Sequence, residues 1–376
     1  MNLNNLSAMA SELGRYGEAL ETVRRAVEIN RRLVKDRRDV ALPELAMSLN
    51  TLSIRLRHQG RHDEALEAAR EALANYRRLS ESRPETCLPD VARGLNNLGA
   101  MLSDLEKYEE ALEATEEAAV HFRRLAESHP DAYLPALATV LYNRGHDLEA
   151  AGRIEEALAS ARESVTYLRR LAADRPEVFR PDLVRTLDGL ANRLRSSGSQ
   201  VEALELAQEV VGHLRDLAGA NPELFLADLA QGLRKLGEIH CEEGGYEEAI
   251  ADLRESVDRF RQLTVDRADL YESDLIESLR RLASCYEALD RSSDELETVQ
   301  EMVAISRRRA DSGDEKALVE LAQCLDTLGT LLSRLGRREE AARALRETLD
   351  ILGNVTKGRP EMRDRLARLE VLLENR

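Results

Sequence analysis

The stretch VARGLNNLGAMLSDLEKYEEALEATEEA, residues 91–118, decides the fold of this chain. Its first half spaces its apolar residues at i, i+4, i+7 and i+11, and these residues are Val91, Leu95, Leu98 and Leu102. That spacing keeps them on one face of a helix. A second apolar stripe follows the break near Glu106 and contains Ala111, Thr115, Ala118, Phe122 and Leu125. The stretch therefore predicts two amphipathic helices joined by a short turn.

The turn segment EKYEEAL at Glu106 is one copy of a repeat with a period of 46 residues. Related segments such as GRYGEAL, GRHDEAL and GRIEEAL occur eight times without an insertion, with joints at residues 14, 60, 106, 152, 198, 244, 290 and 336. A fixed internal period of this size indicates a repeat architecture in which each unit packs on its neighbours.

Glycine and proline mark the ends of the predicted helices. Glycine at most joints supplies the left-handed backbone that ends a first helix. Between units, the dipeptides Arg83-Pro84, His129-Pro130, Arg175-Pro176 and Asn221-Pro222 are expected to end each second helix. Further prolines, Pro43, Pro89, Pro135 and Pro181, are expected near the first turn of the next helix, where a missing N–H costs nothing.

This pattern resembles the tetratricopeptide repeat family over the whole chain. The resemblance rests on Leu95-Asn96-Asn97-Leu98-Gly99, Tyr108, Glu110-Ala111-Leu112 and Ala118. A small residue after the leucine recurs at Ser53, Gly99, Gly145, Ala191, Gly237, Ala283 and Gly329, and an alanine in the turn at Ala19, Ala65, Ala111, Ala157, Ala203, Ala249 and Ala341. The family's common unit has about 34 residues. The longer unit is similar to the kinesin light chain type and to the repeat arrays of bacterial signalling proteins.

We therefore predict an all-α fold, a right-handed α-solenoid of about eight helix-turn-helix repeats forming one domain over residues 1–376. A capping helix is expected at 360–375, with Met362, Leu366, Leu369 and Leu373 on one stripe. The chain starts inside a first helix, which indicates either a piece of a longer protein or a tolerated short helix. In the seventh unit, Glu295 replaces the turn alanine and residues 311–314 replace the proline linker. This irregularity reflects either neutral sequence drift or a soft joint that allows the last helices to pivot.

Composition limits the classes of function. The formal net charge of −16 opposes binding to nucleic acid or to an anionic membrane, because both need a surplus of cations. The cysteines Cys87, Cys241, Cys285 and Cys324 show no paired spacing that would indicate disulfides or a zinc motif. No apolar run is long enough to span a bilayer. We expect a cytoplasmic protein with free thiols.

Motifs for chemistry are missing from the sequence. It contains no glycine-rich phosphate loop, nucleophile elbow or metal-ligand spacing, so we predict no enzyme, no catalytic residues, no metal and no cofactor. His58 and His62 lie on either side of a joint, and His240 takes a position that is leucine in most units, which favours a packed histidine.

The resemblance implies that the first helices line a concave face and that their outward positions contact a ligand. Those positions are Asn50, Arg93, Asn96, Asn97, Tyr142, Asn143, His146, Arg185, Asp188, Asn192, Arg234 and Arg281, with Arg195, Lys235 and Arg280 beside them. The recurring asparagines either read a peptide backbone or serve the packing of the repeat. Arg93, Asn97, Asn143 and Arg185 resemble part of a carboxylate clamp, although Gly189 stands where a second cation is expected.

The prediction for function is a non-catalytic scaffold or adaptor that binds a peptide or helix of a protein partner in the concave groove. Two alternatives stay open. The chain is the sensor or autoinhibitory arm of a larger multidomain signalling protein, or it is a self-assembling array that forms oligomers through its uncapped first repeat.

Overall fold

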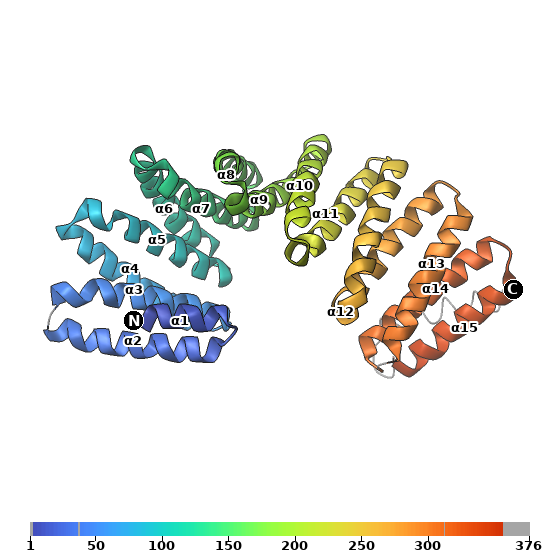
Figure 1. Ribbon diagram of the computed structural model, residues 1–376, viewed down its shortest axis with the longest axis horizontal. Coiled ribbons are helices and arrows are strands. Elements are labelled where there is room, and N and C mark those ends of the chain that lie inside the picture. The colour runs from blue at the N-terminus through green and yellow to red at the C-terminus, as the bar shows by residue number, and fades with distance from the viewer. Residues whose placement is uncertain (1–2, 37, 312, 356–376) are drawn as a thin grey trace. The chain divides into compact units, whose positions relative to one another are not determined.

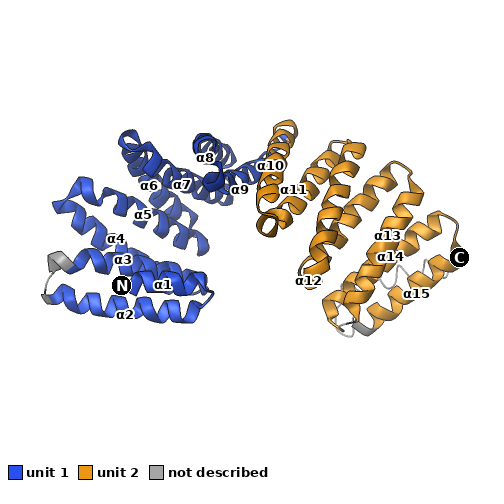
Figure 2. Cartoon of the chain, in the orientation of Figure 1, with its two compact units in different colours: residues 1–199 blue, residues 200–376 orange. Residues whose placement is uncertain are grey.

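The computed structural model describes residues 3–36, 38–311 and 313–355, and this part of the chain contains fifteen helices and no strand (Figure 1). The prediction of an all-α repeat solenoid is confirmed. The chain divides into two compact units, residues 1–199 and 200–376 (Figure 2). The predicted capping helix at 360–375 lies outside the described residues.

The described part of the first unit contains nine helices that run back and forth. They are α1 (Leu3–Glu12), α2 (Tyr16–Asp36), α3 (Arg38–His58), α4 (His62–Ser82), α5 (Pro84–Asp104), α6 (Tyr108–Ser128), α7 (Pro130–Ala150), α8 (Ile154–Asp174) and α9 (Pro176–Ser196). Odd-numbered helices are the predicted first helices of each repeat, and even-numbered helices are the second ones. Each helix packs on the helix before it and the helix after it within the unit.

The described part of the second unit contains six helices. They are α10 (Gln200–Ala220), α11 (Pro222–Glu242), α12 (Tyr246–Ala288), α13 (Ser292–Ala310), α14 (Glu315–Arg334) and α15 (Arg338–Val355). The long helix α12 consists of a second helix and the next first helix, joined at Arg267, whose φ of −137° and ψ of 54° are not helical. Arg83 has nearly the same backbone angles, φ −142° and ψ 66°, ahead of a proline. The bend between repeats therefore forms with or without proline.

The first helices begin earlier than the prolines suggested. Pro84, Pro130, Pro176 and Pro222 occupy the first turn of α5, α7, α9 and α11. Pro43, Pro89, Pro135 and Pro181 lie inside helices, so their predicted place in the first turn is wrong. Proline is favoured at the first helical position and leaves one hydrogen bond unmade further in. The earlier proline starts the helix, and the later one costs a single bond of the second turn.

The joints adopt the left-handed backbone that the sequence predicted. Gly60 and Gly152 have φ angles of 70° and 76°. Two joints lack glycine, and there Glu106 and Asp290 take positive φ angles of 57° and 56°. The shape of the turn is therefore set by the two helices that it connects and not by glycine alone.

The two helices of a repeat approach most closely at the recurring small residue. The turn alanines from Ala19 to Ala249 are fully buried. A Cβ added at Gly99 or Gly145 would lie 3.4 Å from the carbonyl oxygen of Ala111 or Ala157, twelve residues further along. At Gly237 and Gly329 an added Cβ would lie 2.7 Å from a leucine side chain of the second helix. The prediction that the small residue permits close approach is confirmed.

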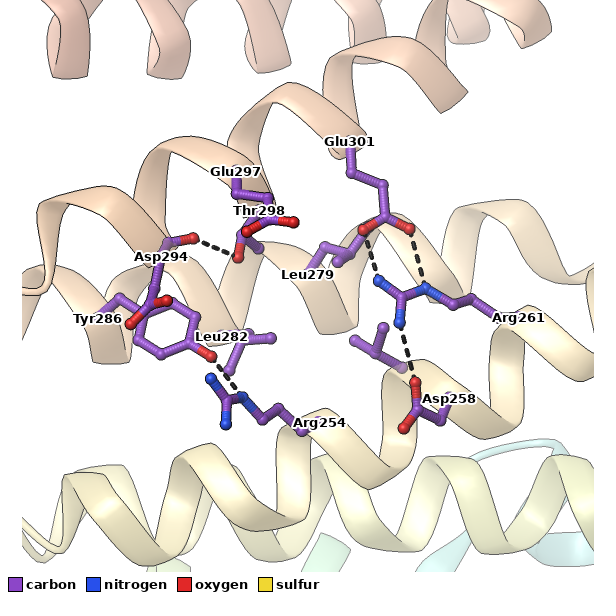
Figure 3. A pocket seen from close by; sticks show the side chains of 11 residues that line it. Arg254, Asp258, Arg261, Leu279, Leu282, Tyr286, Asp294, Glu297, Thr298 and Glu301 are labelled. Atoms are coloured by element: carbon purple, nitrogen blue, oxygen red, sulfur yellow. Dashed lines mark hydrogen bonds and ion pairs between the residues drawn. The ribbon is translucent and has the colours of Figure 1, made fainter.

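The second helices of neighbouring repeats are linked by ion pairs between residues 40 positions apart. One equivalent pair per repeat forms a row: Arg31–Glu71, Arg77–Glu117 and Arg123–Glu163 in the first unit, and Arg215–Glu255, Arg261–Glu301 and Arg307–Glu347 in the second, with N–O distances of 2.5 to 2.9 Å. Figure 3 shows one of them, Arg261 with Glu301. Exposed pairs contribute about 0–1 kcal/mol each. We interpret this ladder as setting the register between repeats more than their stability.

Close approach at Gly237 predicts a sharp difference between two glycine substitutions in the second unit. Gly237→Ala places a methyl group 2.7 Å from Cγ of Leu253 and should lower the free energy of unfolding by about 1–3 kcal/mol. Gly212→Ala is the matched control, because nothing lies within 4 Å of its added Cβ. It should raise the free energy of unfolding by about 0.5–1 kcal/mol. Denaturation in urea measures both, and equal effects would contradict close packing at Gly237.

Candidate functional site

The outward side of the first helices is the candidate site. Their leucine stripes face the second helices, as the buried Leu183, Leu187 and Leu190 of α9 show. The predicted site residues Arg93, His146, Arg185, Asn192 and Arg281 are exposed. The other predicted residues, Asn50, Asn96, Asn97, Tyr142, Asn143, Asp188 and Arg234, are half-buried. Each of the twelve side chains is therefore at least partly accessible.

Neighbouring first helices touch one another directly, since α3 contacts α5 and α5 contacts α7. The asparagines lie in this seam. Nδ2 of Asn97 donates to Oδ1 of Asn50 at 2.7 Å, and Nδ2 of Asn143 donates to Oδ1 of Asn96 at 3.2 Å. The asparagines thus join successive repeats. Each amide retains further hydrogen-bonding capacity, because it has two donors and two acceptor positions.

Tyr142 and Arg185 form the most distinctive pair on this face in the first unit. The guanidinium carbon of Arg185 lies 5.4 Å from the centre of the Tyr142 ring, and Nη2 lies 2.8 Å from Oδ1 of Asp182. Gly189 supplies no second cation for a clamp, and a Cβ there would lie 3.3 Å from Cε2 of Tyr142 and 3.4 Å from Nη1 of Arg193. The exposed Arg185 has both a stacking partner and an ionic partner.

Arg193 is a buried cation that the sequence analysis missed. Its side chain is 6% exposed, and its Nε donates to Oε2 of Glu149 at 2.9 Å. Its Nη1 is buried without a hydrogen-bond partner. The sequence carried no clear signal for its burial, because the same repeat position holds the charged Arg55 and Asp147 as well as the apolar Met101, Ile239 and Leu331.

A groove of about 680 Å³ lies beside Arg93 in the first unit. It is formed by the first half of α3, the end of α4 and the first half of α5. Its apolar lining includes Leu42, Pro43, Met47, Tyr76 and Leu79, and its charged lining includes Arg78, Glu81, Arg83, Asp90 and Arg93. This volume is in the range of pockets that take small molecules or a few side chains of a peptide.

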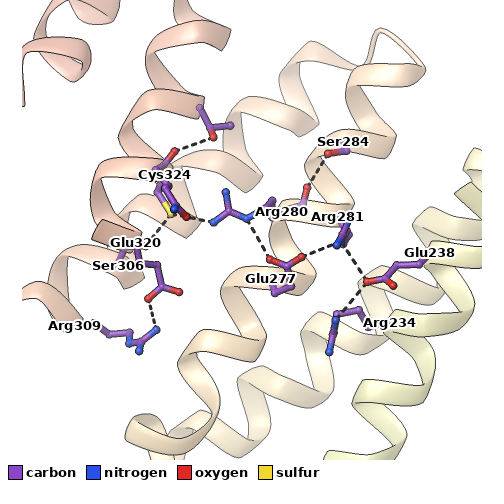
Figure 4. Close-up of polar contacts among 12 residues, drawn as sticks. Arg234, Glu238, Glu277, Arg280, Arg281, Ser284, Ser306, Arg309, Glu320 and Cys324 are labelled. Carbon is purple, nitrogen blue, oxygen red and sulfur yellow. Dashed lines mark hydrogen bonds and ion pairs between the residues drawn. The ribbon is translucent and has the colours of Figure 1, made fainter. Parts of the chain in front are cut away.

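Acidic partners neutralise the cations on the first helices of the second unit (Figure 4). Arg281 lies 2.9 Å from Glu277 and 3.3 Å from Glu238, and Glu238 also lies 3.4 Å from Arg234. Arg280 lies 3.3 Å from Glu277. A ligand that binds these arginines has to compete with the chain's own carboxylates.

Buried ionisable groups elsewhere are tied into structural pairs. Burial raises the pKa of Asp252, and this carboxyl lies 2.8 Å from Nδ1 of His240, as expected for a packed histidine. Burial also raises the pKa of Asp147, while the hydroxyl of Ser103 acts in the opposite direction. Within residues 3–36, 38–311 and 313–355, no three histidine, cysteine or acidic residues gather as a metal site would require.

A second, smaller groove of about 270 Å³ lies between the first half of α12 and α13 (Figure 3). Nε of Arg254 donates to the hydroxyl of the buried Tyr286 at 2.6 Å. The ladder pair Arg261–Glu301 lines the same groove. Its polar groups are therefore engaged in holding neighbouring helices together.

The irregular seventh repeat has a buried glutamate in place of the turn alanine. Glu295 is 5% exposed, and its carboxylate pairs with Arg334 at the end of α14, which also pairs with Glu287. Asp314 caps the start of α14 after this linker, and its carboxylate accepts a hydrogen bond of 3.2 Å from the backbone N–H of Ala317. Whether this joint is soft stays a prediction.

Repeated helix pairs with buried turn alanines and a polar outward face define a helical repeat protein of the interaction-scaffold class. Models of the tetratricopeptide repeat match residues 1–78, and also 91–131 and 321–355. A model described as anaphase-promoting complex subunit 5 matches residues 125–168. The chain belongs to the tetratricopeptide repeat superfamily.

Solved structures show the same fold at low sequence identity. One is a signal transduction ATPase with numerous domains from Pyrococcus horikoshii, which has a tetratricopeptide repeat sensor. It is 14% identical with a TM-score of 0.57, and the match covers 93% of this chain and 52% of the ATPase chain. The C-terminal part of a repeat protein from Cytophaga hutchinsonii is 12% identical with a TM-score of 0.53, covering 83% and 97%. BtubC from P. vanneervenii is 17% identical with a TM-score of 0.49, covering 67% and 94%. No curated protein matches the sequence.

The buried Glu295 predicts a pH-dependent stability difference. Burial raises its pKa, while Arg334 acts in the opposite direction. The folded chain therefore holds this proton to higher pH than the unfolded chain, and stability falls as pH rises above the ordinary pKa of about 4.3. Glu295→Ala removes that loss. The melting temperature of the variant should therefore rise relative to that of the wild type as the pH increases from 4 to 7.

The exposed Glu297 on the same helix provides the matched control. Glu297→Ala should show no such change with pH. Arg334→Ala leaves the buried carboxylate without its cation and should cost about 1–3 kcal/mol at neutral pH. A pH-independent difference between Glu295→Ala and the wild type would contradict a raised pKa.

Proposed function

We propose that this chain is a non-catalytic scaffold that binds a peptide or helix of a partner protein on the first helices of its first unit. The groove beside Arg93 carries the proposal. It joins an apolar floor, made by Tyr76 and Leu79, to the exposed Met47 and Arg93 of neighbouring first helices. A bound segment would place apolar side chains in the groove and its backbone along the asparagine seam.

Polar groups on the first helices beyond the groove suit an extended segment. Asn97 and Asn143 lie half-buried on successive first helices, and Arg185 follows on the next one. A chain that crosses these helices would meet two amides and then a planar cation. Arginine recognises carboxylates in a bidentate way, which favours an acidic segment or a free C-terminus.

A non-catalytic role is supported by how the ionisable groups are used. The carboxyls whose pKa values are raised by burial include Asp147, Asp252 and Glu320, and they face Ser103, His240 and Arg309 in contacts that hold helices together. We propose no cofactor. The net charge of −16 favours a protein partner over nucleic acid or a membrane surface.

A cytoplasmic location is part of the proposal. The four cysteines are free thiols, which suits a reducing compartment. No helix in the described ranges is both long and apolar enough to cross a membrane.

Two other roles have an observation in their favour. The Pyrococcus horikoshii ATPase, which has a tetratricopeptide repeat sensor, matches 93% of this chain over about half of the ATPase's own length. This match favours a role for the present chain as the sensor arm of a larger protein. Exposed Ile29 and Leu33 near the end of α2 favour self-assembly. Sedimentation equilibrium distinguishes the last role, since a concentration-independent monomer would exclude it.

Photo-crosslinking tests which face binds the partner. A photoreactive benzoylphenylalanine at Arg93 should capture the partner from a lysate of the source organism, and excess unlabelled chain should suppress the capture. The same group at Val120, a 53% exposed residue of α6, is the control on a second helix. Capture of the partner from position 120 and not from position 93 would overturn the assignment of the face.

Arg185→Ala tests the carboxylate preference once the partner segment is known. Loss of a charged hydrogen bond costs about 1.5–3 kcal/mol, so affinity for an acidic or free-acid peptide should fall about ten- to a hundredfold. The melting temperature should change little, because the side chain is exposed. Fluorescence anisotropy with a free-acid peptide and its amidated form makes the comparison, and equal affinities would remove the preference for a C-terminus.

A further inference from the structure

Neighbouring first helices meet side chain to side chain at one recurring register. Residues 44 positions apart face each other there. Ser11 accepts a hydrogen bond of 2.9 Å from Arg55, and Glu149 accepts one of 2.9 Å from Arg193. These pairs occupy the same two positions of the 46-residue repeat. The contact therefore recurs at this register with different side chains.

In the second unit, this register holds two cysteines. Cys241 on α11 and Cys285 on the second half of α12 are 44 residues apart and occupy the same two repeat positions. Both belong to one apolar cluster, in which Cys285 is 1% exposed and Cys241 is partly buried. Their shared register and their place in this cluster set the two side chains next to one another. The two sulfurs thus face each other, and only Cys241 is open to a solvent oxidant.

The surroundings make the two thiols unequal. The neighbouring Cys285 thiol lowers the pKa of Cys241, and the nearby guanidinium of Arg281 acts in the same direction. The pKa of Cys285 is raised by the neighbouring Cys241 sulfur and by burial. The thiolate is the nucleophilic form of cysteine. Cys241 is therefore the attacking thiol, and Cys285 is placed as its resolving partner.

We propose that Cys241 and Cys285 form a modification site at which a hydroperoxide, such as hydrogen peroxide, joins the two thiols in a disulfide. The Cys241 thiolate attacks one peroxide oxygen, the O–O bond breaks, and the released hydroxide takes up a proton to leave as water. Cys241 becomes a sulfenic acid. The Cys285 sulfur then attacks the Cys241 sulfur, the S–O bond breaks, and the hydroxyl leaves with the Cys285 proton as a second water. Two thiols lose two electrons and one peroxide gains them.

The disulfide would fix two neighbouring first helices to one another. Arg281, which acts on Cys241, also pairs with Glu238 and Glu277 on the polar side of the same helices. Oxidation would therefore restrain the outward face of the second unit next to its densest group of ion pairs. This inference is independent of the groove in the first unit.

Peptide mapping of the full chain after graded hydrogen peroxide treatment tests the site. Trypsin releases Cys241 in residues 236–254 and Cys285 in residues 282–291. Oxidised chain should lose two hydrogen atoms and give these two peptides linked, and dithiothreitol should reverse the link. Cys285→Ser should stop at a Cys241 sulfenic acid that dimedone labels, with helical content by circular dichroism unchanged.

Cys87, also partly buried but in another repeat, is the internal control. Cys87→Ser should form the link as the wild type does, and Cys241 should react with peroxide at least severalfold faster than Cys87. Three results would overturn the proposal. They are oxidation of Cys241 in the wild type without a link to Cys285, oxidation of Cys87 as fast as Cys241, and disulfides formed only between chains.

Discussion

The structure depends on one close contact, between the small residue of a first helix and the backbone around the turn alanine of the second helix. With nothing larger than a methyl group at either position in most repeats, the two backbones meet at a fixed distance. This contact aims the leucine stripes inward and leaves the opposite side of each first helix free. The candidate site follows from that constraint, because the side chains that point away from the core form the outward face of the first helices.

Much of the fold follows from sequence periodicity, and the parts that do not are informative. The period of 46 residues and the apolar stripes predicted the helix pairs, their turns and their close approach. The prolines were harder to place, since Pro84 and Pro89 both suit the start of a helix and only the bend at Arg83 shows which one begins it. The asparagine seam and the Cys241–Cys285 contact stayed hidden. They join residues 47 and 44 positions apart, spacings that acquire meaning only when the stacking of first helices is known.

Polar residues on the candidate site serve two demands at once. Asn97 and Arg281 hold neighbouring repeats together, while both still present part of their side chains to solvent. A face built in this way offers a partner hydrogen-bonding groups that are already oriented, which reduces the entropy lost on binding. The two units differ in this respect, because the first has an apolar groove beside its arginine and the second has arginines enclosed by carboxylates.

The ladder of arginine and glutamate on the second helices has a consequence for how such a chain changes in evolution. Each arginine pairs with the glutamate 40 residues further along. Each second helix inside this row therefore offers an equivalent glutamate to the repeat before it and an equivalent arginine to the repeat after it. Excision of residues 83–128 would bring Arg77 against Glu163 in place of Glu117, with the same geometry. Duplication of one unit would extend the ladder by one rung. Gene rearrangement in whole multiples of the period therefore keeps the register of this ladder, whereas any other length breaks it at that point.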